Sequence, residues 1–326
     1  MNCMDHASRK PGSRKPAGKQ AALESGVIVV DKPEGETSAA VVNRLKRLSG
    51  IYKAGHTGTL DPFATGVLIC PVNRATRLSR FFLRGRKKYN AVLRLGAETD
   101  TLDRTGEITA EHRIPDLSEE EIRRIIKGYT GRIEQVPPAY SALKHNGVPL
   151  YKYARKGKPV YKPARTVEIY EISVKNIDLP EISIEVSCSG GTYIRTLCSD
   201  IGRSLGCGGY LNELVRIESC GFGIDEAASL SSLEAVGTAG ELQRFVIPMA
   251  EALRGMQAHV AGPELTEKIR FGRPVSEADL GGKTAGPENE NSAFVKIVDN
   301  NNRLLAVIEK EKDKFEYSYC CVFQSG

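Results

Sequence analysis

Asp61 is the residue of this chain best placed for carboxylate chemistry. It lies in the loop sequence GHTGTLDP at residues 55–62, just before an apolar run at 67–72 that predicts a buried strand. Pro62 fixes its own φ and biases Asp61 toward extended backbone, so the carboxylate projects in a defined direction. Such a carboxylate can act as nucleophile or general base. An Asp-Pro turn that caps its own loop fits the same spacing, and both interpretations stay open.

Positive charge is concentrated in two segments of the chain. The net charge is +6, yet eight Lys or Arg lie between Asp61 and the next acid, Glu98. Residues 144–165 hold seven Lys or Arg and three Tyr with no acid. Basic groups bind phosphates and aromatic faces stack on bases, so looped or single-stranded RNA is the predicted partner. An ordinary solvated surface insertion would have the same composition.

Three further residue types could join such a site. Arg195, at the start of a predicted helix, could pair with Asp61, because an unpaired buried carboxylate takes up a proton; a surface ion pair is the alternative. Tyr89 and Tyr193 could stack on a base or pack in the core. His56 could contact RNA or be an ordinary loop histidine.

Composition argues against several other classes of protein. No apolar run reaches the roughly 18–20 residues of a membrane span, and the start of the chain has no apolar signal-peptide core. The eight cysteines show no CxxC or Cys/His metal spacing, which is typical of a reduced cytosolic protein. We therefore expect a cytoplasmic protein with no metal, no cofactor and no membrane partner.

The hydrophobic pattern predicts an α+β fold in which helices pack on a mixed, largely antiparallel sheet. Helices are expected after Thr37 or Ser38, after Ser118 as a capping box, and after Thr192, which we expect to cap a helix ending at Gly206. Predicted strands of the core cover residues 26–31, 67–72, 89–95, 166–177 and 181–188.

Composition also divides the chain into segments. Residues 1–22 are polar and basic and predict a disordered leader, with an RNA-binding arm as the alternative. Residues 23–246 form the predicted catalytic domain, which contains a protruding basic insertion at 135–165. Residues 247–326 predict a small β domain with strands at 294–298, 304–309 and 317–323, preceded by a linker at 280–292.

Five segments in order resemble the TruB-type tRNA pseudouridine synthases. The signature is GHTGTLDP followed by ATGVL, and the resemblance extends from residue 26 to about 235. One departure is that the segment 216–222 lacks the proline usually found before the phenylalanine. The matching segments are 31–38, 55–68, 88–103, 135–157 and 191–208.

The resemblance implies a function and an architecture. The expected fold is the pseudouridine synthase fold, with residues 135–165 as a thumb-like, RNA-gripping insertion and a PUA-like C-terminal domain. The expected reaction is isomerisation of uridine to pseudouridine at position 55 in the T-loop of tRNA. The base is flipped out, its N1–C1′ bond breaks and a C5–C1′ bond forms. The implied partner is the tRNA T-arm, bound by a monomer without guide RNA or cofactor.

The resemblance also assigns roles to single residues. Asp61 is the implied catalytic aspartate, whether it acts on the sugar, on the ring or as a base. Tyr89 is implied to stack on the flipped base and to help with proton removal, and Arg195 is implied to pair with Asp61. Tyr193 and Leu214 are implied to line the pocket. The implied role of His56 is to fill space vacated in the RNA loop, and that of Lys32 and Pro33 is to support the catalytic loop.

Three alternatives remain at this point. A dyskerin-type synthase shares the catalytic domain but takes its target from a guide RNA, and the thumb-like insertion argues against it. A tRNA-folding chaperone would use the same RNA surface without chemistry. A generic basic RNA-binding module leaves the ordered series of motifs unexplained.

Overall fold

The computed structural model describes residues 23–281, 293–310 and 316–323. The predicted leader at 1–22 and most of the predicted linker at 280–292 lie outside these ranges. No helix within the described ranges has both the length and the apolarity needed to cross a membrane.

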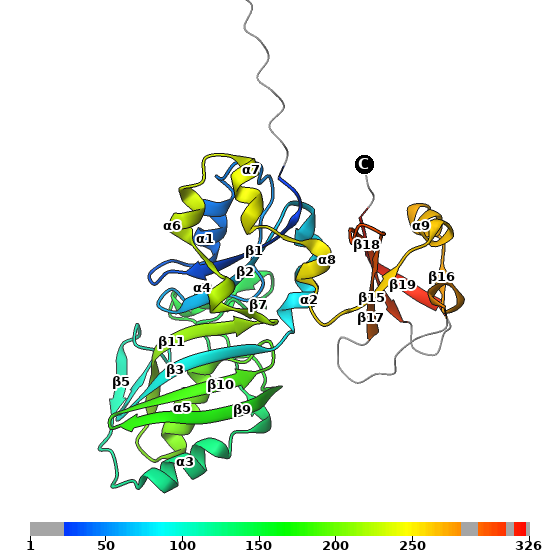
Figure 1. Ribbon diagram of the computed structural model, residues 1–326. Helices are drawn as coiled ribbons and strands as arrows, with labels where there is room; N and C mark the ends of the chain where they lie inside the picture. Colours follow the sequence, from blue (N-terminus) through cyan, green and yellow to red (C-terminus); the bar gives the residue numbers. More distant parts are fainter. Residues whose placement is uncertain (1–22, 282–292, 311–315, 324–326) are drawn as a thin grey trace, which may run out of the picture.

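A large sheet forms the centre of the molecule (Figure 1). Its strands are β1 (Gly26–Lys32), β2 (Thr65–Val72), β3 (Lys87–Leu95), β6 (Gly131–Gln135), β9 (Arg165–Asp178), β10 (Glu181–Cys188), β11 (Gly209–Ser219), β12 (Phe222–Gly223), β13 (Ala228–Ser229) and β14 (Ile247–Pro248). Their order is β13-β1-β2-β11-β3-β10-β9-β6, with β12 beside β11 and β14 beside β1. The β1–β13 and β2–β11 pairs are parallel and the other pairs are antiparallel. The predicted mixed, largely antiparallel sheet and the α+β class are confirmed.

Helical segments pack against this sheet in several groups. The helical segments are α1 (Ser38–Leu45), η1 (Asn73–Leu78), α2 (Ser79–Leu83), α3 (Glu119–Lys127), α4 (Leu150–Ala154), α5 (Ile194–Ser204), η2 (Ile224–Glu226), α6 (Leu230–Glu234), α7 (Ala239–Leu242), η3 (Gln243–Phe245) and α8 (Met249–Ala252). Helices α3 and α5 pack on β3, β9, β10 and β11 around one apolar core. Helices α1, α6 and α7 pack on β1 and β2 around another.

Strands β1 and β2 are buried on both faces, and this explains their continuous apolar sequences. Ile28 and Val30 of β1 point into the core shared with α1, α6 and α7. Val27 and Val29 point to the opposite face, where α2 and α8 lie. A strand covered on both faces reads as a continuous apolar run. In β3 buried and exposed residues alternate, as expected for a strand with one covered face.

The helix starts follow the sequence signals in two cases and depart from them in one. Thr37 caps α1 by accepting a hydrogen bond from the Ala40 amide, and Ser118 caps α3 in the same way from Glu121. The prediction that Thr192 caps the third helix is wrong. Helix α5 starts one residue later with Tyr193 at the N-cap position, and the Thr192 hydroxyl donates to the Ser189 carbonyl. A tight turn after β10 satisfies this hydroxyl before the helix begins.

The basic insertion contains two short strands and one short helix. Strands β7 (Lys144–His145) and β8 (Val148–Pro149) form a hairpin that leads into α4. Leu150 and Ala154 of α4 are buried, whereas Lys152, Arg155 and Lys156 are exposed. A second hairpin, formed by β4 (Ala97–Thr99) and β5 (Ile108–Glu111), leaves the sheet after β3. The turn between β4 and β5 carries Thr101 and Asp103, which belong to the site described below.

A second, five-stranded sheet in the described part of the chain lies beside the large one (Figure 1). Its strands are β15 (Gln257–Val260), β16 (Val275–Ser276), β17 (Phe294–Val298), β18 (Leu304–Lys310) and β19 (Glu316–Val322). The helical segments in this part of the chain are α9 (Pro263–Arg270) and η4 (Ala278–Leu280). The expected C-terminal β region is confirmed. Because β14 pairs with β1, residues 247–248 belong to the large sheet. The division of the chain into domains near residue 247 remains a proposal.

Candidate active site

The loop that carries Asp61 is fixed by hydrogen bonds from neighbouring segments. The Ser38 hydroxyl, which is buried, accepts from the Leu60 amide at 2.9 Å and donates to the Leu60 carbonyl at 3.1 Å. The Gly35 amide donates to the Pro62 carbonyl at 2.8 Å. These contacts hold both residues that flank Asp61, so its carboxylate has a defined position.

Lys32 supports the same loop from the end of β1. Its ammonium donates to the carbonyl oxygens of Pro33, Pro62 and Ala64 at 2.8, 3.2 and 2.7 Å. Burial lowers the pKa of Lys32 to about 8. Lys32 thus contacts the loop at Pro62 and Ala64, and its ammonium joins the Pro33 carbonyl to them.

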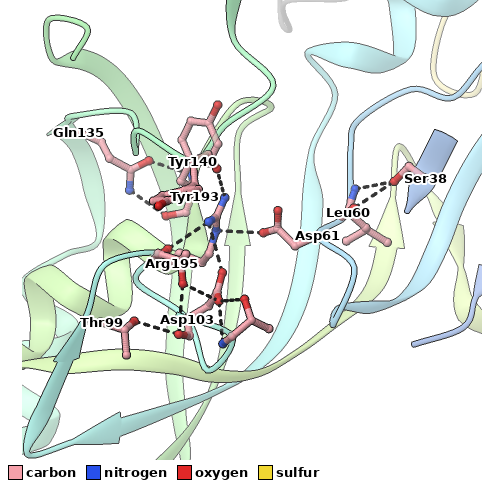
Figure 2. Close-up of polar contacts among 11 residues, drawn as sticks. Ser38, Leu60, Asp61, Thr99, Asp103, Gln135, Tyr140, Tyr193 and Arg195 are labelled. Atoms are coloured by element: carbon pink, nitrogen blue, oxygen red, sulfur yellow. Dashed lines mark hydrogen bonds and ion pairs between the residues drawn. The ribbon is translucent and has the colours of Figure 1, made fainter. Parts of the chain in front are cut away.

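Arg195 lies between two carboxylates (Figure 2). Its Nε is 2.9 Å from Asp61 Oδ2, and its Nη1 is 3.2 Å from Asp103 Oδ2. Arg195 and Asp103 are nearly inaccessible to solvent, whereas the Asp61 side chain keeps 30% of its exposure. The expected contact between Arg195 and Asp61 is present, and the exposed carboxylate is the one that a substrate can reach.

Arg195 also donates hydrogen bonds to two backbone carbonyls. Its Nη1 also donates to the Thr101 carbonyl at 3.0 Å, and its Nη2 donates to the Tyr140 carbonyl at 2.9 Å. Tyr140 lies at the start of the basic insertion, and Thr101 lies in the β4–β5 hairpin. The guanidinium therefore joins three segments that are distant in sequence (Figure 2).

Asp103 is itself held in place by the residues around it. Its Oδ1 accepts from the Thr101 hydroxyl, the Thr105 amide and the Thr105 hydroxyl at 2.9, 3.0 and 2.6 Å. The Thr99 hydroxyl donates to the Asp103 carbonyl at 2.8 Å. These donors hold the Asp103 carboxylate in one position, where it forms a fixed anchor for Arg195.

The electrostatics of Asp61 reflect competing influences. Burial raises the pKa of the Asp61 carboxyl, the Arg195 guanidinium opposes this rise, and the charge of Asp103 adds to it. Desolvation outweighs the pairing with Arg195, so the pKa of Asp61 lies above its usual value. An aspartate with a raised pKa is a stronger base and nucleophile than a free one once it is ionised.

Two further predicted residues lie in the apolar core beside the loop. Tyr89 and Leu214 are buried and belong to the same core as Leu60 and Phe63. Their strands are adjacent, since β3 pairs with β11. Burial raises the pKa of the Tyr89 hydroxyl, so Tyr89 is neutral at physiological pH.

Tyr193 and His56 lie at the margin of the site. Gln135 fixes the Tyr193 backbone, accepting from its amide at 2.8 Å and donating to its carbonyl at 3.0 Å. The Arg165 guanidinium lies 5.0 Å from the centre of the Tyr193 ring. His56 Nδ1 is buried without a hydrogen-bond partner, and burial lowers the His56 pKa. Both side chains are partly exposed and could meet a bound molecule.

Asp103 is the residue of this network that the sequence analysis did not single out. It lies within the segment 88–103, which was assigned to the family motif as a whole. Its signal was a carboxylate among three threonines in the sequence TDTLDRT. Within the described residues no group of three or more His, Cys, Asp or Glu is arranged to hold a metal ion.

Comparisons with family models and with known proteins agree on one family. Residues 46–194 match the model of the "TruB family pseudouridylate synthase (N terminal domain)", and residues 195–254 match the "tRNA pseudouridylate synthase B C-terminal domain". The chain is 42% identical over 255 residues to tRNA pseudouridine synthase B of Geobacter sulfurreducens, covering 78% of this chain and 84% of that one. It is 40% identical over 286 residues to the protein of the same name from Syntrophobacter fumaroxidans, covering 87% and 92%.

The fold is also shared with a more distant solved structure. The chain in the "Crystal Structure of a Cbf5-Nop10-Gar1 Complex" superposes with a TM-score of 0.71 at 24% identity, over 95% of this chain and 91% of that one. At this level of identity the likeness shows the fold alone. It extends over both sheets of the molecule.

Proposed function

The chain belongs to the TruB family of pseudouridylate synthases, tRNA uridine isomerases, and we propose that it modifies the uridine at position 55 in the T-loop. The observation that carries the proposal is the Asp61–Arg195–Asp103 network, in which the family's signature loop presents one accessible carboxylate. The basic insertion at 135–165 lies next to this network and supports direct binding of a T-arm by a single chain, without guide RNA.

The proposed reaction needs only groups that this chain provides. The flipped uridine loses its N1–C1′ bond, the base turns, and a C5–C1′ bond forms. The hydrogen on C5 leaves as a proton and N1 gains one, so substrate and product are isomers. Unstacking of the target base costs a few kcal/mol, which contacts between the protein and the loop must offset.

Each site residue has a proposed part in this reaction. Asp61 acts on the flipped nucleotide, and Arg195 orients it. Tyr89 stacks on the base and assists removal of the C5 proton, while Tyr193 and Leu214 line the pocket. His56 fills the space that the flipped base leaves in the RNA loop, and Lys32 and Pro33 hold the catalytic loop.

Mapping of the modified position tests the proposed specificity. We expect the purified protein, without metal or guide RNA, to form pseudouridine at position 55 of an unmodified tRNA transcript and in its isolated T-arm hairpin. Carbodiimide mapping by reverse transcription identifies the position. A transcript with cytidine at position 55 is the control and is expected to stay unmodified. Modification at another uridine, or only with added guide RNA, would refute the proposed specificity.

A further inference from the structure

Arg216, on β11, is a fully buried cation that the roles above do not use. Only 1% of its surface is exposed. Its Nε donates to the Val67 carbonyl at 2.6 Å, and its Nη2 donates to the Gly58 carbonyl at 3.1 Å. A buried charge that is held by carbonyls alone is costly, and an apolar side chain of similar size would fill the space at lower cost. This cost indicates a role beyond packing.

The contacts of Arg216 involve the segments on both sides of Asp61. Gly58 lies three residues before Asp61 in the catalytic loop, and Val67 lies in β2 just after that loop. The charge of Arg216 also partly offsets the rise that burial causes in the pKa of Tyr89. One guanidinium therefore contacts the segments before and after Asp61, and its charge acts on the side chain proposed to stack on the base.

The backbone of Arg216 makes the same connection. Its partner across β2 is Gly66, and its partner across β3 is Tyr89. Gly66 has a φ of +97°, and a Cβ there would lie 2.3 Å from the Arg216 carbonyl oxygen. A side chain at residue 66 would collide with β11, so the glycine allows the backbones of β2 and β11 to approach closely at Arg216.

Arg216 also influences His56. After burial, the charge of Arg216 is the second cause that lowers the pKa of His56. In its proposed role, a neutral His56 would fill space in an RNA loop without adding charge. Its pKa thus depends on the same guanidinium that contacts the catalytic loop.

We propose that Arg216 is a positioning residue that fixes the Asp61 loop relative to Tyr89. This inference rests on the proposed function, because it concerns the geometry of that same site. It predicts that loss of the guanidinium slows the chemical step while tRNA binding, which uses the surface, is retained.

The test compares Arg216→Met and Arg216→Lys with the wild-type protein. We expect Arg216→Met to bind tRNA with the wild-type dissociation constant and to isomerise it about 100-fold more slowly in a single turnover, because misplacing catalytic groups by about 1 Å has that effect. Arg216→Lys keeps the charge and a donor without the fork, so we expect it to recover part of the rate. Assays are run below the unfolding temperature of each variant.

Lys87 provides a matched control. It is also buried, and its ammonium donates to the carbonyls of Phe82, Leu83 and Gly85, which lie outside the catalytic loop. We expect Lys87→Met to lower the unfolding temperature and to keep the wild-type rate while folded. The inference is overturned if Arg216→Met keeps the wild-type rate, or if Lys87→Met is slowed equally at a matched loss of stability.

The design separates failure of this inference from failure of the proposed function. An inactive wild-type protein would refute the proposed function. If Arg216→Met does not fold, the decision rests on Arg216→Lys. A reduced single-turnover rate with unchanged tRNA affinity supports the role, and a wild-type rate overturns it.

Discussion

Arg195 carries one positive charge and contacts two carboxylates, so each residue of the network affects the other two. Asp103 is buried and saturated with donors, which makes it the anchor, whereas Asp61 is partly exposed. Sequence reasoning could propose the Arg195–Asp61 pair because a buried carboxylate needs a cation. It could not assign Asp103, because nothing in the spacing of residues 103 and 195 shows that they meet in space.

The role of Asp103 is tested by Asp103→Asn. We expect the free energy of unfolding to fall by about 3 kcal/mol, since one partner of a buried ion pair is removed. The single-turnover rate should fall about 10- to 100-fold because Arg195 loses its anchor. Chemical denaturation and a single-turnover assay measure these effects. The control is Glu98→Gln, which breaks the exposed Arg203–Glu98 pair. Equal effects of the two substitutions would contradict the account.

Lys32 gives a prediction about pH. Its pKa is lowered from 10.5 to about 8 in the folded protein, chiefly by burial. Below pH 8 both the folded and unfolded states hold the proton, and the folded state bears the full cost of the buried charge. As pH rises above 8 the folded state releases the proton first, so stability increases relative to a variant without this group.

We therefore expect wild type to gain about 2 kcal/mol of unfolding free energy relative to Lys32→Met between pH 8 and pH 9.5. Urea denaturation of both proteins at the two pH values measures the difference. A difference that stays constant would show that Lys32 keeps an ordinary pKa in the fold, and one that moves in favour of Lys32→Met would show a raised pKa; either result contradicts the prediction.

At the scale of elements, local signals explained most of the fold. The apolar runs of β1 and β2, the alternation in β3 and the Thr37 and Ser118 caps each act within a few residues, so they could be read from the sequence. The N-cap of α5 could not, because the hydroxyl of Thr192 is taken by a turn. The order of strands in the sheet depends on long-range packing, and the sequence pattern did not determine it.

The insertion at 135–165 gives the element-scale prediction. Lys152, Arg155 and Lys156 are exposed on and just after α4. Their joint replacement by alanine should weaken tRNA binding and reduce the slope of log affinity against log salt by about 2, because phosphate contacts release counterions. Binding measured at several salt concentrations gives this slope.

Helix α3 offers a matched control for this experiment. Its three exposed basic residues, Arg123, Arg124 and Lys127, lie on a helix that Figure 1 places at the far end of the large sheet from α1 and α6. Their replacement by alanine removes the same charge. We expect the salt slope to stay near the wild-type value, and an equal reduction in both triple variants would show a non-specific effect of net charge.

At the scale of the whole molecule, the two sheets share an apolar core. Val29 of β1 and Phe82 of α2 lie in one apolar cluster with Leu304 and Val307 of β18 and with Phe323. The Arg77 guanidinium donates to the Val322 carbonyl at 2.6 Å across the same contact. Figure 1 shows α2 and α8 between the two sheets. The sequence predicted a separate β region but gave no sign of this shared core.

Phe323→Ala tests whether the C-terminal sheet is coupled to the rest. Phe323 is buried, so we expect a loss of about 3 kcal/mol of unfolding free energy. Thermal unfolding of wild type should be a single transition, and the variant should lose stability in both sheets. Phe271→Ala is the control, because that ring is 61% exposed and its loss should change stability by under about 0.5 kcal/mol. Two separate transitions in wild type would contradict the coupling.

We propose that the Asp61 carboxylate performs the isomerisation on a single bound tRNA. The most direct test is tritium release from tRNA carrying 5-tritiated uridine, with Asp61→Asn beside wild type and tRNA affinity measured in parallel. We predict multiple-turnover release by wild type, no release by Asp61→Asn, and tRNA binding by both. Release by Asp61→Asn at the wild-type rate, or tight binding without release by wild type, would contradict the account.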